Sequence, residues 1–209
     1  MTYGSLFAGV GGFDIGFDRA GFKCAWRVEW EHKCIDVLHK LPHCPTYGDI
    51  TRVKHTNLEP VDVVLGGFPC TDLSVCAKGS HEGLEGQYSG LVHEYARIVQ
   101  GLQPKIFVVE NVPRLLKVWD SVMKMGYFDG YTTYGEILDA QDFGAYTRRK
   151  RAFIVGHLGA RSPRAILDFS AVYRQVARVG RGKDVLPMCL PWKGGVSLER
   201  LGACLVVPN

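Results

Sequence analysis

The sequence has no apolar run long enough to cross a bilayer as a helix, which needs about 18 to 20 consecutive apolar residues. The segment from Met1 to Ser5 has no basic stretch ahead of an apolar one, so we expect no secretory signal. Internal repeats and low-complexity tracts are also missing. Because 46% of the 209 residues are hydrophobic and 22% are charged, the composition is that of a globular protein rather than a disordered segment. These features predict no membrane partner and a cytoplasmic location.

The cysteines lack the spacing of a metal or redox motif. None lies three positions from another, as in a Cys-x-x-Cys pair, which removes the support for a zinc ribbon or a thioredoxin-like site. Without a secretory signal we expect reduced thiols, most of them acting as small buried apolar side chains. No metal site is predicted. The seven cysteines are Cys24, Cys34, Cys44, Cys70, Cys76, Cys189 and Cys204.

Positive charge is concentrated in the last third of the chain. From Arg148 onward there are 12 Lys and Arg against 3 Asp and Glu, whereas residues 1–147 hold 13 against 18. A basic end on an acidic body indicates a polyanionic partner that binds at that end. A solvated basic face without a partner explains the same asymmetry equally well.

Short apolar runs alternate with segments of helical periodicity. From Cys34 to Leu41 the apolar residues recur as on one face of a helix. Ile106–Val109 is entirely apolar, as in a strand buried on both faces of a parallel sheet. The alternation predicts a doubly wound α/β sheet with ligands at the carboxyl ends of its strands. The expected strands are 3–7, 22–28, 61–65, 106–109, 132–138 and 152–158, and the expected helices are 13–21, 34–41, 91–102 and 115–123.

Two segments do not fit the alternation. Residues 79–90 are rich in glycine, have no core pattern and are expected to form a mobile loop. Residues 159–209 are rich in arginine and have no clear periodicity, so the sequence assigns them no elements.

The first expected strand ends in the glycine-rich turn Phe7–Gly12. Glycines there let a ligand approach the main chain and open a helix toward it. Glu29, 20 residues after Gly9, ends the next strand, where an acid can bond both hydroxyls of a ribose. Asp49, at the strand end after that, could accept a hydrogen bond from an adenine amino group. A nucleotide-like cofactor is one interpretation, and a glycine turn beside a surface acid is the other.

Two further strand ends carry reactive side chains. Cys70 follows the strand that leads to Gly66, where a thiolate could attack an electrophilic carbon. Glu110 ends the apolar strand, and desolvation there favours its neutral form, which can donate a proton to a ring nitrogen. Taken singly, Cys70 could be a buried apolar residue and Glu110 a structural acid paired with a base.

Together these motifs resemble those of the DNA (cytosine-5) methyltransferases. Ser5–Phe13 resembles the opening motif of the family, and five later motifs follow in the family's order and approximate spacing, over about residues 3–157. The resemblance implies a Rossmann-like S-adenosylmethionine-dependent methyltransferase sheet, with a catalytic and cofactor-binding domain at 1–158. The later motifs are Glu29-Trp30, Gly48-Asp49-Ile50, Gly67-Phe68-Pro69-Cys70, Glu110-Asn111-Val112 and Thr147-Arg148-Arg149-Lys150-Arg151.

The resemblance implies S-adenosylmethionine as the methyl donor. Glu29 would hold its ribose, and Trp30 would pack on its adenine. Asp49 and Ile50 would bind the edge of the adenine ring. The full implied cofactor site is Phe7, Gly9, Gly11, Gly12, Glu29, Trp30, Asp49, Ile50, Pro69 and Leu91.

The resemblance also implies a covalent mechanism on a cytosine flipped out of double-stranded DNA. Cys70 would add to C6 of the base, while Glu110 engages N3 and the exocyclic amine. Arg149, and less directly Arg151, would fix the base and offset charge at O2. The implied DNA contacts are Thr71, Ser74, Thr147 and Arg148.

The chain departs from the family pattern in three places. Thr71 and Thr147 stand where the family usually has glutamine, which concerns DNA contacts rather than the central chemistry. Residues 159–209 are too short for both a full target-recognition domain and the family's final motif. We interpret this short form as carrying a minimal basic recognition element, completed by a second subunit or a homodimer.

Several hypotheses therefore remain from the sequence. The first is a compact cytosine-5 DNA methyltransferase of a bacterium or of a phage-infected host cell, with a role such as restriction-modification. A tRNA cytosine-5 methyltransferase is a variant of it, because the same chemistry can act on RNA. The other is a non-catalytic relative that binds cofactor or nucleic acid without turnover.

Overall fold

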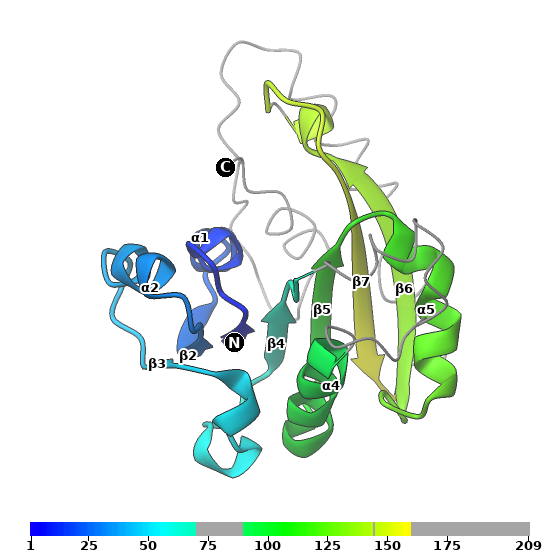
Figure 1. Ribbon diagram of the computed structural model, residues 1–209, viewed down its shortest axis with the longest axis horizontal. Helices are drawn as coiled ribbons and strands as arrows, with labels where there is room; N and C mark the ends of the chain where they lie inside the picture. Colours follow the sequence, from blue (N-terminus) through cyan, green and yellow to red (C-terminus); the bar gives the residue numbers. More distant parts are fainter. Residues whose placement is uncertain (70–89, 144, 160–209) are drawn as a thin grey trace.

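The computed structural model describes residues 1–69, 90–143 and 145–159 (Figure 1). Within these ranges one seven-stranded sheet has the order β3-β2-β1-β4-β5-β7-β6. The strands are β1 (Thr2–Leu6), β2 (Lys23–Val28), β3 (Thr46–Tyr47), β4 (Val63–Gly66), β5 (Ile106–Asn111), β6 (Tyr131–Asp139) and β7 (Lys150–Leu158). The α-helices are α1 (Gly12–Arg19), α2 (His32–Leu38), α4 (Gly90–Leu102) and α5 (Arg114–Lys124), and short 3-10 helices cover Ile50–Arg52, His55–Asn57 and Ala140–Phe143.

The sheet is doubly wound, as the sequence predicts. β1 pairs in parallel with β2 on one side and with β4 on the other, so the strand order reverses between β1 and β4. In such sheets ligands bind outside the carboxyl ends of the strands at the reversal point. β7 is antiparallel to both β5 and β6, which the sequence pattern does not indicate. The carboxyl ends of β1, β2, β4 and β5 therefore share one edge of the sheet.

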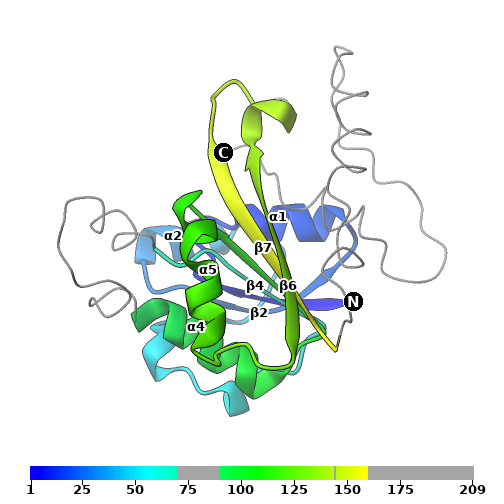
Figure 2. The same cartoon turned by 90° about the vertical axis from the view of Figure 1, so that its right-hand side faces the viewer.

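Helices cover both faces of the sheet (Figure 2). α4 and α5 pack on one face with the larger apolar cluster, and α1 packs on the other with a smaller one. Successive residues of the central strands point to opposite faces and pack into the two clusters alternately. Phe107 belongs to the larger cluster and Val108 to the smaller one. This explains why β5 is apolar along its length and confirms its expected burial on both faces.

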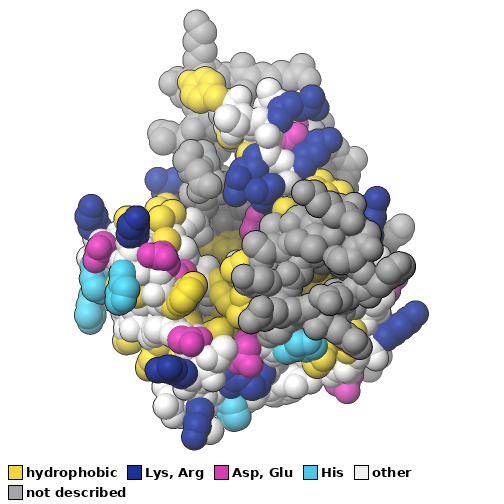
Figure 3. Space-filling model, in the orientation of Figure 1, with side chains coloured by type: hydrophobic (Ala, Val, Ile, Leu, Met, Phe, Trp, Pro, Cys, Tyr) yellow, Lys and Arg dark blue, Asp and Glu magenta, His cyan; other side chains and the backbone are white. Residues whose placement is uncertain are grey.

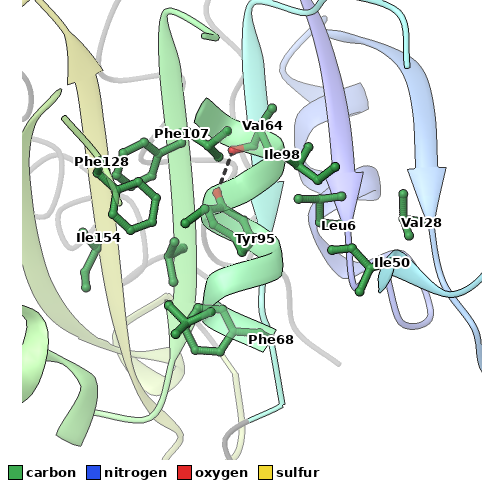
Figure 4. Packing of buried hydrophobic residues seen from close by; sticks show 14 of the residues in the cluster. Leu6, Val28, Ile50, Val64, Phe68, Tyr95, Ile98, Phe107, Phe128 and Ile154 are labelled. Carbon is green, nitrogen blue, oxygen red and sulfur yellow. Dashed lines mark hydrogen bonds between the residues drawn. The ribbon is translucent and has the colours of Figure 1, made fainter. Parts of the chain in front are cut away.

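Tyr95 locks α4 to the two central strands (Figure 4). Its buried hydroxyl lies 3.1 Å from the carbonyl oxygen of Val64 in β4 and 3.0 Å from that of Val108 in β5, and it donates to them. A Cβ at Gly66 would lie 2.6 Å from the Tyr95 ring, so only glycine lets the ring sit there. The end of β4 is therefore held firmly just before the segment that leads to Cys70.

A buried ion pair fixes α1 beneath the first turn. Nε of Arg27 in β2 lies 2.7 Å from Oδ1 of Asp14 in α1, and both side chains are at most 1% exposed. The Ser5 hydroxyl donates to the other oxygen of Asp14 at 3.1 Å. Removing one partner of such a pair costs about 3–5 kcal/mol, because the other charge stays buried and unpaired. The helix that opens from the glycine turn is thus tied to both neighbouring strands.

One expectation about the cysteines is wrong. The structure joins Cys24 and Cys44 in a disulfide, with their Cα atoms 6.1 Å apart, whereas the sequence led us to expect reduced thiols. The cause is topological: Cys24 lies in β2 and Cys44 lies just before β3, and these two strands pair side by side. A spacing of 20 residues carries no such signal before the pairing of the strands is known.

Helix and strand limits differ from the expected ones mainly at α2. The helix ends at Leu38 rather than at Leu41, and Leu38 is its buried residue, while Val37 remains 36% exposed. Among the described residues, no helix is both long enough and apolar enough to span a membrane.

Candidate active site

The glycine turn after β1 has a main-chain conformation that favours glycine. Gly9 and Gly11 have positive φ angles of 57° and 86°, and Phe7 has one of 53°, which is uncommon for a residue with a side chain. Apart from the chain neighbours and the backbone of α1 itself, no heavy atom of the described residues lies within 4 Å of the place that a Cβ would occupy at Gly9 or Gly12. The main chain here borders open space, so a ligand can approach it closely.

Glu29 ties the end of β2 to this turn. Its Oε2 accepts a hydrogen bond from the main-chain N–H of Gly9 at 2.7 Å. Its Oε1 accepts from the N–H groups of Trp30 and Glu31 at 2.9 and 2.8 Å. A carboxylate has about four acceptor positions, so these bonds leave roughly one for a ligand hydroxyl. Glu29 shapes the turn as well as facing the site.

The expected adenine-binding residues differ in their exposure. The Trp30 ring is 72% exposed and free to stack on a flat ligand. Asp49 is exposed as well, and hydrogen bonds from the N–H and hydroxyl of Thr51 hold the pKa of its carboxyl below the usual range. Ile50, in contrast, buries its side chain in the larger apolar cluster, which leaves only its main chain for a ligand. The open turn, the exposed ring and the charged acid fit the S-adenosylmethionine site that the resemblance implies.

Glu110 lies at the end of β5, on the face of the sheet that α1 covers. Its Oε1 lies 3.0 Å from Nε of Arg151. Burial raises the pKa of the Glu110 carboxyl above its ordinary value, although the charges of Arg151 and Arg149 oppose the rise. The direction agrees with the expectation that this acid is held toward its neutral form. A Cβ at Gly67 would lie 2.9 Å from the other oxygen, Oε2. Glycine at 67 therefore makes room for the carboxyl beside the segment that precedes Cys70.

The two expected base-binding arginines are placed differently. Arg151 is the second residue of β7, whereas Arg149 directly precedes the strand. Arg151 is partly buried against Glu110, whereas Arg149 is exposed and donates its main-chain N–H to Oδ1 of Asp139 at 3.0 Å. Arg151 is therefore the arginine that pairs with the acid, while the expected contacts of both arginines with the base remain predictions.

Basic side chains gather at the far end of the β6–β7 hairpin (Figure 3). Thr147 and Arg148 are exposed in the segment that enters β7. Nε of Arg148 lies 3.8 Å from Oδ2 of Asp139, whose other oxygen binds the Arg149 N–H. Tyr146, just before them, is fully exposed. The hairpin end thus presents charge and an aromatic ring to solvent, as a nucleic-acid contact requires.

Asn111 is a site residue to which the sequence assigned no role. Its side-chain amide donates to the carbonyl oxygen of Phe68 at 2.9 Å, and its own oxygen accepts from the N–H of Val112 at 2.8 Å. An amide that directly follows an acid at the end of a buried strand is the only signal that could have indicated it. Asn111 joins the end of β5 to the segment after β4.

The remaining expected residues divide into two groups. Pro69 is exposed at the end of its described segment, and Leu91 is half-buried against the larger apolar cluster. Cys70, Thr71 and Ser74 lie outside the described residues, as does the basic region 160–209.

Comparison with known proteins agrees with this arrangement. The family model for C-5 cytosine-specific DNA methylase matches residues 1–178. The chain is 33% identical over 165 residues to the Type II methyltransferase M.BsuFI of Bacillus subtilis, covering 75% of this chain and 39% of that protein. It is 36% identical over 169 residues to M1.HphI of Haemophilus parahaemolyticus, covering 75% and 45%. The chain thus spans less than half the length of these two relatives.

Among solved structures, a prophage-encoded E. coli protein described as a DNA modification methyltransferase superposes with a TM-score of 0.61. The two are 27% identical, and the match covers 76% of this chain and 47% of that one. The sequence match therefore extends to the fold. By its motifs, its sheet and the match over residues 1–178, this chain belongs to the C-5 cytosine-specific DNA methylase family.

Proposed function

We propose that this chain transfers a methyl group from S-adenosylmethionine to C5 of a cytosine flipped out of double-stranded DNA, through a covalent adduct with Cys70. The observation that carries the proposal is the state of Glu110. A partly buried carboxyl with a raised pKa, 3.0 Å from an arginine and beside the segment that leads to Cys70, suits protonation of a ring nitrogen.

The chemistry needs a nucleophile and an acid together, because C5 of cytosine is too weak a nucleophile to take a methyl group unaided. In the proposed reaction the Cys70 thiolate forms a bond to C6. The C5–C6 π pair moves to make a C4–C5 double bond, the C4–N3 π pair moves onto N3, and Glu110 donates a proton to N3. C5 becomes nucleophilic as a result.

S-adenosylmethionine supplies an electrophilic methyl group on a sulfonium sulfur. After C5 has taken the methyl group, a base removes the C5 proton, and its electron pair restores the double bond as the bond from Cys70 to C6 breaks. The N3 proton returns to Glu110, so the acid and the thiolate are both regenerated. Arg151 pairs with the acid and is proposed to offset charge on the ring, together with Arg149, whose charge also acts on Glu110.

The cofactor is proposed to lie along the glycine turn. Trp30 stacks on its adenine, Asp49 accepts from the adenine amine, and Glu29 uses its remaining acceptor position for the ribose. The open space at Gly9 and Gly12 and the exposure of Trp30 support this placement. On the DNA side, Thr147 and Arg148 lie in the basic hairpin end and are proposed to contact the phosphate backbone, together with Thr71 and Ser74.

We further propose that residues 159–209 act as a minimal recognition element and that a second subunit or a second copy completes the DNA-binding cleft. The basic composition of this region supports its proposed part in DNA binding. Sedimentation with and without DNA measures the stoichiometry.

A transfer assay tests the proposed function. The protein and its Cys70→Ala variant are incubated with methyl-labelled S-adenosylmethionine and either duplex DNA or tRNA. We expect label on C5 of cytosine in DNA, absent from tRNA and lost in the variant. Label on tRNA alone would show that the substrate is tRNA rather than DNA. Cofactor binding without transfer to either nucleic acid would indicate a non-catalytic relative.

A further inference from the structure

We propose that Asn111 is a positioning residue that fixes the segment carrying Cys70, through its hydrogen bond to the carbonyl oxygen of Phe68. The inference rests on the proposed function, in which Cys70 is the nucleophile. Phe68 precedes Cys70 by two residues, which is a reach of at most about 7 Å of chain. A shift of the Phe68 carbonyl therefore moves Cys70 with it.

Asn111 is suited to this role by its chemistry and its burial. Its side chain is 3% exposed and both ends of its amide are used: Nδ2 donates to Phe68, and Oδ1 accepts from Val112. A side-chain amide can donate to one main-chain group and accept from another at once. Buried hydrogen bonds of this kind hold geometry because a lost partner leaves a desolvated polar atom behind.

The Phe68 ring is held from two further sides. It packs edge-on against Phe7 of the glycine turn, with ring centroids 6.5 Å apart, and against Tyr95 of α4 at 6.3 Å. Phe68 is thus in contact with the cofactor turn, the central helix and the end of β5. The ring of Phe68 is fixed by packing, and its carbonyl oxygen is held by the Asn111 side chain. Asn111 therefore sets the direction in which the chain continues toward Cys70.

A nucleophile must approach C6 within a narrow range of distance and angle. A displacement of about 1 Å can cost roughly 100-fold in rate. Loss of the Asn111 bond should therefore slow formation of the bond from Cys70 to C6, and leave cofactor binding, which depends on the turn at the other side of Phe68, nearly unchanged.

The test measures covalent trapping on duplex DNA that carries 5-fluorocytosine. Fluorine at C5 cannot leave as a proton does, so the adduct persists and its rate of formation can be followed in a single turnover. The variants are Asn111→Ala and Asn111→Asp, the second of which keeps the size of the side chain and its acceptor for the Val112 N–H. Rates are expressed per mole of sites that bind S-adenosylmethionine, so loss of folded protein does not enter.

Tyr131→Phe is the matched control. It also removes a buried side-chain donor from a main-chain carbonyl, that of Pro104 at 2.6 Å, but at the opposite end of the sheet. We expect both Asn111 variants to trap about 10- to 100-fold more slowly than wild type, with the dissociation constant for S-adenosylmethionine changed less than about threefold. Tyr131→Phe should trap at the wild-type rate per site even if it melts at a lower temperature.

The outcomes separate this inference from the proposed function. Wild-type trapping together with Asn111 variants that match Tyr131→Phe would overturn the role of Asn111 and leave the proposed function standing. Wild-type protein that forms no adduct would refute the proposed function, and the inference with it.

Discussion

The glycine turn after β1 and the β6–β7 hairpin contribute to the same site but are built in different ways. The turn is fixed through its main-chain N–H groups, that of Gly9 bonding to the Glu29 carboxylate and that of Ala8 to the Val28 carbonyl, and it leaves open space beside Gly9 and Gly12. The hairpin end is fixed mainly through Asp139 and presents exposed basic side chains. A small ligand is selected by an exact main-chain shape, whereas a polyanion needs accessible charge.

Glu110 lies between the hairpin and the segment that follows β4. Arg151, at the start of β7, reaches the acid from the hairpin side, and Gly67 makes room for it from the side of β4. The comparison therefore predicts that changes in the turn affect cofactor binding, changes in the hairpin affect DNA binding, and changes at Glu110 affect the chemical step alone.

The largest effect is expected at Glu110. Glu110→Gln cannot donate a proton to N3, so methyl transfer should fall by about 100- to 10,000-fold, while the dissociation constant for S-adenosylmethionine stays near that of wild type. Since the active form is the protonated one, and burial raises the pKa of Glu110, wild-type kcat should fall as the pH rises through that raised pKa. A pH profile of single-turnover transfer measures this limb. If the fall of the rate with rising pH persists in Glu110→Gln, it is caused by another titrating group.

The second-largest effect is expected at Glu29. Glu29→Gln places an amide N–H where the carboxylate now accepts from Gly9 or Trp30, so the turn should lose its shape. We expect the dissociation constant for S-adenosylmethionine to rise about 10- to 100-fold, since each charge-assisted bond contributes about 1.5–3 kcal/mol. Calorimetric titration with the cofactor measures it. DNA binding without cofactor should be unaltered, and a matching loss of DNA affinity would count against the division of roles.

A smaller effect is expected at Gly67. In Gly67→Ala the new methyl group would lie 2.9 Å from Oε2 of Glu110, so the carboxyl must shift. We expect kcat to drop about 10-fold, in line with a shift of less than 1 Å, and KM for DNA to remain within about twofold. Steady-state kinetics separates the two constants. An unchanged kcat would show that the position of the acid tolerates this displacement.

The smallest effect is expected at Arg148. Arg148→Ala removes one exposed charge from the hairpin end, so DNA affinity should weaken a few-fold and the salt dependence of binding should lose about one unit of slope. Fluorescence anisotropy at several salt concentrations measures both. Cofactor binding serves as the control, because the far end of the β6–β7 hairpin and the turn that leads into α1 lie apart in the fold (Figure 1).

The sequence predicted the parts of the site that follow a central strand. An apolar run such as Ile106–Val109 has one plausible place, inside the sheet, so the first polar residue after it must lie at the ligand edge. Glu110 could therefore be placed and its pKa shift anticipated in direction. The glycine turn could be found in the same way, because it directly follows the first apolar run.

Features that depend on how distant segments pair could not be predicted. The antiparallel insertion of β7 between β5 and β6 determines that Arg151, rather than Arg149, reaches Glu110. The neighbouring positions of β2 and β3 determine that Cys24 meets Cys44. Two further contacts could not be predicted, because each joins the ends of two different strands. They are the bond from Gly9 to Glu29 and the bond from Asn111 to Phe68.

The central claim is that Cys70 bonds to the target base, and one measurement tests it directly. Duplex DNA containing 5-fluorocytosine is incubated with the protein and S-adenosylmethionine, the complex is digested, and the peptide that carries the nucleotide is sequenced by mass spectrometry. The account predicts a single modified peptide with the nucleotide linked to the sulfur of Cys70. Methyl transfer to DNA without an adduct at Cys70, or an adduct mapped to another cysteine, would contradict it.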